Sequence, residues 1–254
     1  MNNVAEGMSQ QIIAAIRKVV LQSNPVLHEP YFDSDDHDFV NDCIASGFVS
    51  SVGAYVEKFE HQLAQYTGAS HCVAVVNGTA ALHVALIIAG VEQHDEVLVP
   101  TLCFVATANA VAYCMATPHF IDCDPTTLGI NPDVLDGYLA EVTSFRDGVC
   151  VNRKTGRRIS ALMLMHTFGH IGDVDRVLEV AKKYGIAVIE DAAEALGSWR
   201  GGQSAGTFSG IGVLSFNGNK TITTGGGGAL LLSDPILAKR AKHLTTTAKV
   251  SHPW

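Results

Sequence analysis

The sequence contains no run of about 18 uninterrupted apolar residues, the length that a membrane-spanning helix requires. Its first residues also lack the order of basic, apolar and small residues that marks a signal peptide. The 17 basic residues against 25 acidic ones give a net charge of −8, so no broad basic field is available for nucleic acid. These absences predict a cytoplasmic protein with neither a membrane nor a nucleic acid as its partner.

Cysteine pairs of the C-x-x-C type are absent, and no histidines stand near the cysteines at metal-ligand spacing. The sequence therefore predicts free buried thiols and no metal site. What is present is 254 residues, 47% of them hydrophobic and only 17% charged, which suffices for a sizeable core and excludes disorder and fibres. The six cysteines are Cys43, Cys72, Cys103, Cys114, Cys123 and Cys150.

From position 71 onward, short apolar runs alternate with segments of helical length. This alternation is typical of a largely parallel, doubly wound α/β sheet. Two later runs, 211–216 and 229–232, have little helix between them and predict an antiparallel edge or hairpin. The predicted strands are 71–76, 96–99, 119–122, 161–165 and 187–189, and the predicted crossover helices are 79–89, 104–113, 132–139 and 173–184.

The N-terminal part predicts a helix over 11–21 and then an extended segment imposed by Pro25 and Pro30. Asp35 and Asp36 are expected to cap a second helix that stops at Gly47. A third helix follows, with an apolar stripe formed by Val56, Phe59, Leu63 and Tyr66. We expect the second and third helices each to cover another surface.

The segment 146–158 is unusually basic and surrounds a turn-forming stretch at 154–156. It predicts an inserted hairpin. A solvated basic loop is the favoured interpretation, and a role in gripping a diphosphate is the alternative.

Three loops that follow predicted strands carry residues suited to chemistry, and such loops gather at one edge of a parallel sheet. In the first loop Gly78, Thr79 and Ala80 open a helix, where backbone N–H groups and the helix dipole can hold a phosphate. An ordinary strand-to-helix turn is the alternative for so short a pattern.

The second loop places Glu190 and Asp191 at the end of an apolar strand, and Glu194 follows on a turn of small residues. A buried Asp191 needs a positive partner, which the protonated ring nitrogen of a cofactor would supply. A strand-end aspartate that caps the next turn is the alternative.

The third loop brings Ser215 and Lys220 just ahead of four consecutive glycines, 225–228, which leave room for a bulky group. A lysine among small and polar residues forms a Schiff base when its amine is neutral, whereas a solvated surface lysine is the alternative. A phosphate site, an acid and an amine in this order are what a pyridoxal 5′-phosphate enzyme needs.

Two further residues end or follow predicted strands. Phe104 is suited to stack on the ring of the cofactor or, equally, to fill the core. For His166 a hydrogen-bonded core histidine is favoured over a functional one.

Six ordered blocks carry a likeness to a known family over nearly the whole chain. They are Ser50-Ser51-Val52-Gly53 running into Phe59-Glu60, Asn77-Gly78-Thr79-Ala80-Ala81-Leu82, Pro100-Thr101, Ala106-Thr107-Ala108-Asn109-Ala110, Glu190-Asp191-Ala192-Ala193-Glu194-Ala195, and Ser215-Phe216 with Lys220. In these blocks the chain resembles the pyridoxal-phosphate sugar aminotransferases of the DegT/DnrJ/EryC1/StrS family.

The resemblance implies the α/β fold of a type I PLP-transferase (aspartate aminotransferase-like) large domain, with a mostly parallel doubly wound sheet. It implies that backbone N–H groups of Thr79 and Ala80 and the hydroxyl of Ser215 hold the cofactor phosphate. Phe104 would stack on the ring, and Lys220 would bond covalently to the cofactor. Gly78, Asp191 and Glu194 complete the expected cofactor-binding set, with Lys220 and Asp191 as the catalytic pair.

Lys220 also separates the chain from relatives that dehydrate their sugar and carry a histidine at this position. The stretch Leu27-His28-Glu29-Pro30, the 49–53 block and the basic insert most resemble enzymes that aminate C4 of UDP-linked 4-keto-6-deoxy-N-acetylhexosamines. Such enzymes serve the synthesis of legionaminic acid or bacillosamine. The resemblance implies a nucleotide-sugar substrate, an amino acid donor such as glutamate, and a homodimer.

The family resemblance further implies a smaller C-terminal domain, whereas this sequence stops at Trp254. We expect an N-terminal lead-in over 1–34, a PLP-binding large domain over 35–254, and weak or no turnover by this truncated chain. A non-catalytic, cofactor-binding domain is therefore the alternative. A nicotinamide-dependent dehydrogenase is disfavoured, because no G-x-G-x-x-G follows the first predicted strand.

Overall fold

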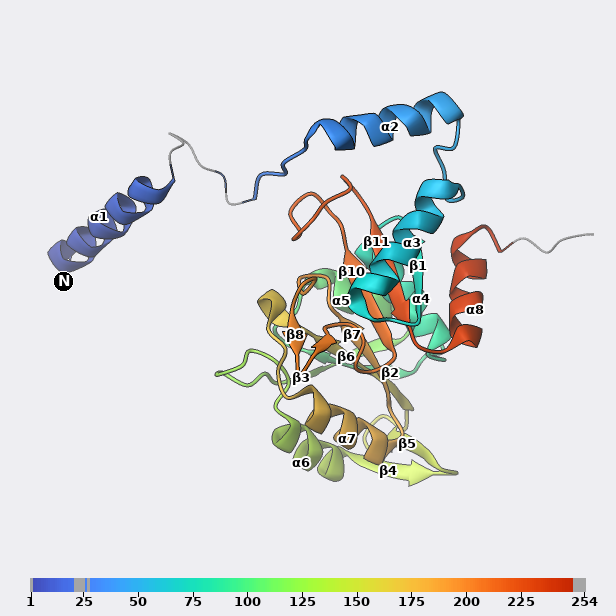
Figure 1. The fold of residues 1–254 in the computed structure, drawn as a ribbon. Coiled ribbons are helices and arrows are strands. Elements are labelled where there is room, and N and C mark those ends of the chain that lie inside the picture. Colours follow the sequence, from blue (N-terminus) through green and yellow to red (C-terminus); the bar gives the residue numbers. More distant parts are fainter. Residues whose placement is uncertain (1, 21–25, 27, 249–254) are drawn as a thin grey trace, which may run out of the picture.

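The computed structural model describes residues 2–20, 26 and 28–248, and its body is a sheet between two layers of helices (Figure 1). The seven strands of the sheet lie in the order β1-β11-β10-β7-β6-β2-β3. Neighbouring strands run parallel except where β11 takes part, so the predicted doubly wound sheet is confirmed. The strands are β1 (His71–Val75), β2 (Glu96–Pro100), β3 (Thr117–Ile121), β6 (Ile159–Met165), β7 (Ala187–Asp191), β10 (Ile211–Ser215) and β11 (Gly228–Leu232).

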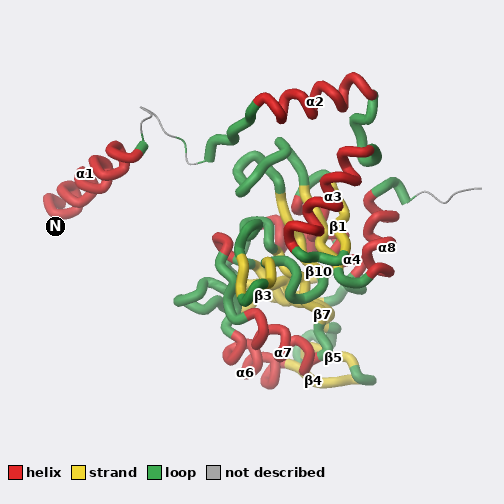
Figure 2. The backbone as a smooth tube through the Cα atoms, in the orientation of Figure 1, coloured by secondary structure: helices red, strands yellow, loops and turns green. Residues whose placement is uncertain are grey.

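Alternating side chains of the strands feed a separate apolar core on each face of the sheet. On β7, Val188 belongs to the core beneath α6 and α7, and Ile189 belongs to the core beneath α4, α5 and α8. Figure 2 shows α6 and α7 lying together on their face. The helices of the body are α3 (Ala54–Thr67), α4 (Gly78–Ile88), α5 (Val105–Tyr113), α6 (Pro132–Val142), α7 (Val174–Tyr184) and α8 (Pro235–Thr245), with a short 3-10 turn η1 (Thr167–Gly169).

The predicted antiparallel pair at the end of the chain is confirmed as β10 and β11. It does not form the edge of the sheet, because β1 pairs with the other side of β11. The four glycines therefore lead into a strand that has a neighbour on both sides, and the last of them, Gly228, is its first residue. A short separate hairpin, β8 (Trp199–Arg200) with β9 (Gln203–Ser204), lies between β7 and β10 in the chain.

The N-terminal helices are α1 (Asn2–Val19) and α2 (Ser34–Ser46). Of the predicted lead-in, Leu21 and Pro25 lie outside the described residues. The N-cap of α2 is Asp33, whose carboxylate accepts the N–H groups of Asp35 and Asp36. The predicted capping role is confirmed for Asp36, because its Oδ2 accepts the N–H of Asp33 over 3.0 Å and completes a capping box, and it is wrong for Asp35. The predicted end at Gly47 is confirmed, with a left-handed φ of 75°.

The expectation that both of these helices cover another surface is confirmed for α3, and for α2 it stays a prediction, because α2 covers no other element of the described chain. Helix α2 contains no buried residue, whereas α3 buries Leu63 against the sheet. The apolar side chains Phe39 and Ile44 instead line a groove of about 570 Å³ between α2 and α3. Within the described residues, no helix combines the length and apolar character needed to cross a membrane.

The predicted hairpin exists but starts ahead of the basic segment 146–158, since it is formed by β4 (Thr143–Arg146) and β5 (Val149–Asn152). Its turn lies at Asp147 and Gly148, where φ is 51° and 78°, so the prediction of a turn at 154–156 is wrong for this hairpin. The 154–156 stretch forms the next turn, which returns the chain toward β6.

The basic segment precedes β6, so it lies at the amino ends of the parallel strands. There Arg158 donates from Nε to Asp95 Oδ1 over 3.0 Å, just ahead of β2. Because α/β sheets bind ligands at the opposite edge, this placement and the exposure of Arg153, Lys154 and Arg157 support a solvated basic loop over a diphosphate grip.

The same amino edge contains a buried carboxylate. Glu96 is 3% exposed and accepts hydrogen bonds from Thr155 Oγ1 at 2.6 Å, Asn152 Nδ2 at 2.8 Å and His119 Nδ1 at 2.7 Å. Burial raises the pKa of Glu96, but these hydrogen bonds from Thr155, Asn152 and His119 outweigh it and leave the pKa below its ordinary value of 4.5. The carboxylate therefore ties three elements to the start of β2.

Replacing Glu96 with glutamine is expected to lower the free energy of unfolding by about 2 kcal/mol near neutral pH, because a buried charged acceptor is lost. Since its folded pKa is depressed, the carboxylate stabilises the protein above pH 4.5, and this stabilisation is lost as the pH falls through the folded pKa. Urea unfolding should show the gap between wild type and Glu96→Gln narrowing on acidification. Exposed Glu92→Gln is the control, and a gap independent of pH would contradict the assignment.

Candidate active site

A cavity of about 310 Å³ opens where β1, β6, β7 and β10 end, at the carboxyl edge of the sheet. All of the predicted site residues except Ala80 line it, although they come from loops up to 142 positions apart in the chain. They are Gly78, Thr79, Phe104, Asp191, Glu194, Ser215 and Lys220. The predicted convergence of the three loops on one cavity is thus confirmed.

The start of α4 forms one wall of the cavity. Asn77 is the N-cap, and its Oδ1 accepts the N–H of Ala80 over 2.8 Å. This amide is therefore engaged in the cap, and Ala80 does not line the cavity, so the structure gives no support to the phosphate contact expected for Ala80. Gly78 and Thr79 supply the N–H groups at the helix start, which have no carbonyl partner within the helix.

Two glycines allow the backbone to come close at this wall. A Cβ on Gly78 would lie 2.9 Å from Ser215 Cβ, so only glycine lets the end of β10 reach the helix start. A Cβ on Gly228 would lie 2.5 Å from the carbonyl carbon of Asn77. The Ser215 hydroxyl thereby joins the first N–H groups of α4, and together they form a cradle for an anion.

Asp191 ends β7 in the floor of the cavity and is 3% exposed. Its Oδ2 accepts the hydroxyl of Thr107 at 2.7 Å, and its Oδ1 accepts the N–H of Ala193 at 3.3 Å. Burial raises the pKa of Asp191, although the hydrogen bonds from Thr107 and Ala193 oppose this. Within the described chain its hydrogen-bond partners are both uncharged, so this carboxylate lacks a paired cation.

Lys220 approaches from the loop after β10, with its side chain 14% exposed. Its Nζ lies 3.4 Å from Glu194 Oε1 and 5.7 Å from the centre of the Phe104 ring. Glu194 also accepts the N–H of Phe168 through Oε2 at 3.1 Å. Phe104 is 60% exposed, so it flanks the cavity and does not fill the core.

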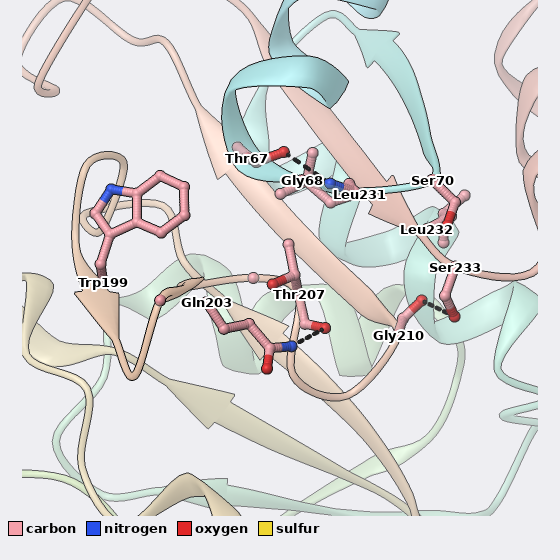
Figure 3. Close-up of a pocket in the computed structure, with 13 residues that line it drawn as sticks. Thr67, Gly68, Ser70, Trp199, Gln203, Thr207, Gly210, Leu231, Leu232 and Ser233 are labelled. Carbon is pink, nitrogen blue, oxygen red and sulfur yellow. Dashed lines mark hydrogen bonds between the residues drawn. The ribbon is translucent and has the colours of Figure 1, made fainter.

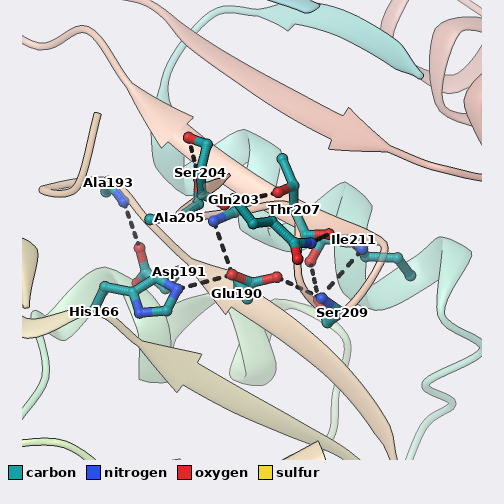
Figure 4. Close-up of polar contacts among 11 residues, drawn as sticks. His166, Glu190, Asp191, Ala193, Gln203, Ser204, Ala205, Thr207, Ser209 and Ile211 are labelled. Atoms are coloured by element: carbon teal, nitrogen blue, oxygen red, sulfur yellow. Dashed lines mark hydrogen bonds and ion pairs between the residues drawn. The ribbon is translucent and has the colours of Figure 1, made fainter. Parts of the chain in front are cut away.

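Glu190 and His166 form a separate, fully buried pair behind the cavity (Figure 4). His166 Nε2 lies 2.8 Å from Glu190 Oε2, and the carboxylate also accepts the N–H groups of Gly206 at 2.8 Å and Ser209 at 2.6 Å. The prediction of a core histidine is confirmed. Glu190 anchors the loop before β10, and it does not line the cavity.

A second hollow of about 240 Å³ lies at the amino ends of β1 and β10, between Trp199 and Ser233 (Figure 3). Its lining, all within the described part of the chain, contains no ionisable side chain. It therefore offers no side chain for acid–base chemistry, and no base to activate its hydroxyl groups.

Thr107 was not predicted to be a functional residue, although it belongs to the 106–110 block that carries the family resemblance. Asn217 and Asn219 also line the cavity, where Asn217 Nδ2 donates a hydrogen bond to Asn219 Oδ1 over 3.0 Å. The available signal for Thr107 was a hydroxyl residue among small apolar ones in the first turn of a helix.

The cysteines are half-buried except for buried Cys150, and burial raises the pKa of the Cys72 thiol to about 12.

Residues 30–253 match the model of the DegT/DnrJ/EryC1/StrS aminotransferase family. The chain belongs to this family. The match includes every predicted site residue, and it confirms the resemblance drawn from the ordered sequence blocks.

Two similar proteins are the GDP-perosamine synthase of Caulobacter vibrioides, 39% identical over 215 residues, and the putative pyridoxal phosphate-dependent aminotransferase EpsN of Bacillus subtilis, 35% identical over 223 residues. The alignments cover 85% and 88% of this chain but 54% and 55% of the relatives. The chain thus spans about half the length of the curated relatives that it matches.

Solved structures give the same result for the fold. A DegT DnrJ EryC1 StrS aminotransferase from Brucella abortus superposes with a TM-score of 0.77 at 30% identity, covering 86% of this chain and 56% of its own. DesI, solved in the presence of its TDP-sugar product, gives 0.76 at 29% identity, covering 88% and 53%. The sheet and its helices therefore form the type I PLP-transferase fold.

Pyridoxal 5′-phosphate is the cofactor of this family, and the cavity fits it. The buried carboxylate of Asp191 without a paired cation suits a protonated ring nitrogen. The cradle of Gly78, Thr79 and Ser215 suits a phosphate. Lys220 completes the set as the amine within reach of an aldehyde.

Proposed function

We propose that the protein transaminates a nucleotide-linked 4-keto-6-deoxy sugar, with glutamate as the amino donor. The observation that carries this proposal is the convergence of Asp191, Lys220 and the α4 helix start on one cavity. The names of similar proteins, GDP-perosamine synthase and a structure holding a TDP-sugar product, support a nucleotide sugar as the substrate class. A UDP-linked N-acetylated hexosamine is our specific expectation for the acceptor.

When bound, pyridoxal phosphate supplies an aldehyde for amine exchange and a cationic ring that withdraws electrons. In the proposed arrangement the N–H groups of Gly78 and Thr79 and the hydroxyl of Ser215 bind the phosphate. Asp191 holds the proton on the ring nitrogen. Phe104 packs on one face of the ring and excludes water from it.

Lys220 has two proposed tasks, since its amine both bonds the cofactor and moves a proton. Once released and neutral, Nζ takes a proton from the α-carbon of the amino donor. In the first half of the exchange it would pass this proton to the aldehyde carbon of the cofactor, and in the second half it would move a proton from that carbon to C4 of the sugar. Glu194, 3.4 Å from Nζ, orients the amine between these positions.

We also propose that the chain acts as a homodimer. The support is the exposed apolar groove between α2 and α3, where Phe48 is 62% and Val52 59% exposed. Contiguous apolar surface of this kind marks protein interfaces. Light scattering at micromolar concentration should give twice the monomer mass, and a monomer would contradict the proposal.

The alternative is a domain that binds the cofactor without turnover. Because the chain aligns with about half the length of its relatives, the experiment has to separate cofactor binding from amine transfer. Purified protein loaded with pyridoxal phosphate should absorb visible light, and borohydride should bleach it and add the cofactor mass at Lys220. In a separate sample that has not been reduced, glutamate alone should shift the spectrum. Amine transfer to UDP-, GDP- or TDP-linked 4-keto sugars would support the aminotransferase, whereas a spectral response without any transfer would support the alternative.

A further inference from the structure

The first turn of α5 has an unusual composition. Phe104 is its N-cap and makes no side-chain cap, although serine, threonine, aspartate and asparagine are the residues that stabilise this position. Three residues later stands Thr107, so both side chains lie on the same side of the turn. A residue that does not suit its local structure, such as phenylalanine at an N-cap, is expected where a functional site requires that side chain. Here the turn directs Phe104 to the cavity and Thr107 to its floor.

Thr107 is fully buried, and its hydroxyl donates to Asp191 Oδ2 over 2.7 Å. A helical threonine ordinarily donates to a carbonyl three or four residues earlier in its own helix. Thr107 instead reaches a carboxylate 84 positions further along the chain. The hydroxyl therefore joins α5 to the end of β7 at the residue expected to face the cofactor.

The surroundings of Asp191 oppose its charge. Burial favours the protonated acid, and the carboxylate of Glu194 acts in the same direction. Lys220 favours the anion, and the second hydrogen bond, from Ala193 N–H, is long at 3.3 Å. The nearby Cys103 thiol is kept neutral, since burial and the charge of Asp191 both raise its pKa. The short bond from Thr107 is thus the strongest single contact that favours a charged carboxylate.

We propose that Thr107 is a positioning residue, whose hydroxyl keeps the Asp191 carboxylate charged and oriented toward the ring nitrogen of the cofactor. This inference rests on the proposed function. A neutral Asp191 has no charge to offer a protonated nitrogen, and an unbonded carboxylate is free to rotate about its χ angles. Thr107 acts through Asp191 without touching the cofactor.

The test compares cofactor binding by Thr107→Val, which keeps the shape and removes the donor, with Thr107→Ser, which keeps the donor. Apoprotein is titrated with pyridoxal phosphate between about pH 6 and 9, and the Kd is read from fluorescence quenching. Valine should raise the Kd about tenfold or more and move the acid limb of the binding profile to higher pH. Serine should restore both.

Thr143→Val is the matched control, because Thr143 is also buried and its hydroxyl donates to a backbone carbonyl of the last turn of α6, Leu139 O, at 2.7 Å. It should lower the melting temperature of the apoprotein and leave the Kd unchanged. If Thr107→Val does not fold, Thr107→Ala removes the same donor and is judged in the same way. A wild-type protein that fails to bind the cofactor would refute the proposed function. Normal binding by wild type, with the same Kd and pH profile in a folded Thr107→Val or Thr107→Ala, would refute the role of Thr107.

Discussion

Replacing Lys220 with alanine is expected to abolish the visible absorbance of the loaded protein and to lower amine transfer by about a thousandfold or more. The variant loses the only amine within reach of the cavity among the residues described, so the cofactor can bind only without a covalent bond. Spectra after dialysis and borohydride treatment followed by mass analysis measure this result.

The control is Lys182→Ala, which removes an exposed lysine from the last turn of α7, just ahead of the start of β7 and so at the edge of the sheet opposite to the cavity. It should keep the wild-type spectrum and the same modified peptide. A Lys220→Ala protein with an unchanged visible spectrum would remove Lys220 from the mechanism.

Replacing Asp191 with asparagine should act in opposite directions on cofactor binding and on stability. The variant should weaken cofactor binding and slow transfer by about a hundredfold or more, because a charged partner in a buried pair is lost. Burial raises the pKa of Asp191, so above its ordinary value of 3.8 the buried charge destabilises the apoprotein. The apoprotein of Asp191→Asn should therefore melt at a higher temperature than wild type at neutral pH.

Glu190→Gln provides the matched comparison, because it changes the adjacent carboxylate on the same strand. Glu190 accepts three hydrogen bonds, so its variant should melt at a lower temperature. Melting curves of both apoproteins decide the point. Shifts of the same sign would show that the two acids do not differ as the structure implies.

The sheet was predictable because its strands are apolar runs that are each followed in the chain by residues typical of loops. Asp191 and Lys220 could be placed together for the same reason, since parallel strands bring their carboxyl ends to one edge. Ala80 shows the limit of this reasoning. Whether an amide at a helix start faces a ligand or its own cap depends on the side chain of Asn77, and the backbone pattern does not determine this.

Other features depended on contacts that no local pattern contains. Helix α2 has an apolar stripe like that of α3, yet only α3 meets the sheet within this chain. Thr107 is informative for the same reason, because its partner lies far along the sequence. The hairpin turn was misplaced since Lys154-Thr155-Gly156 and Asp147-Gly148 are both good turn sequences.

The adjacent acids on β7 have a consequence for how this protein tolerates change. Successive side chains of a strand point to opposite faces of the sheet. Glu190 therefore supports a loop and Asp191 lines the cavity only because they occupy neighbouring positions of β7. Inserting or deleting a single residue within β7 would exchange the two environments while leaving both carboxylates in the sequence. Alignments of distant relatives that shift this strand by one position would consequently assign the cofactor acid to the wrong residue.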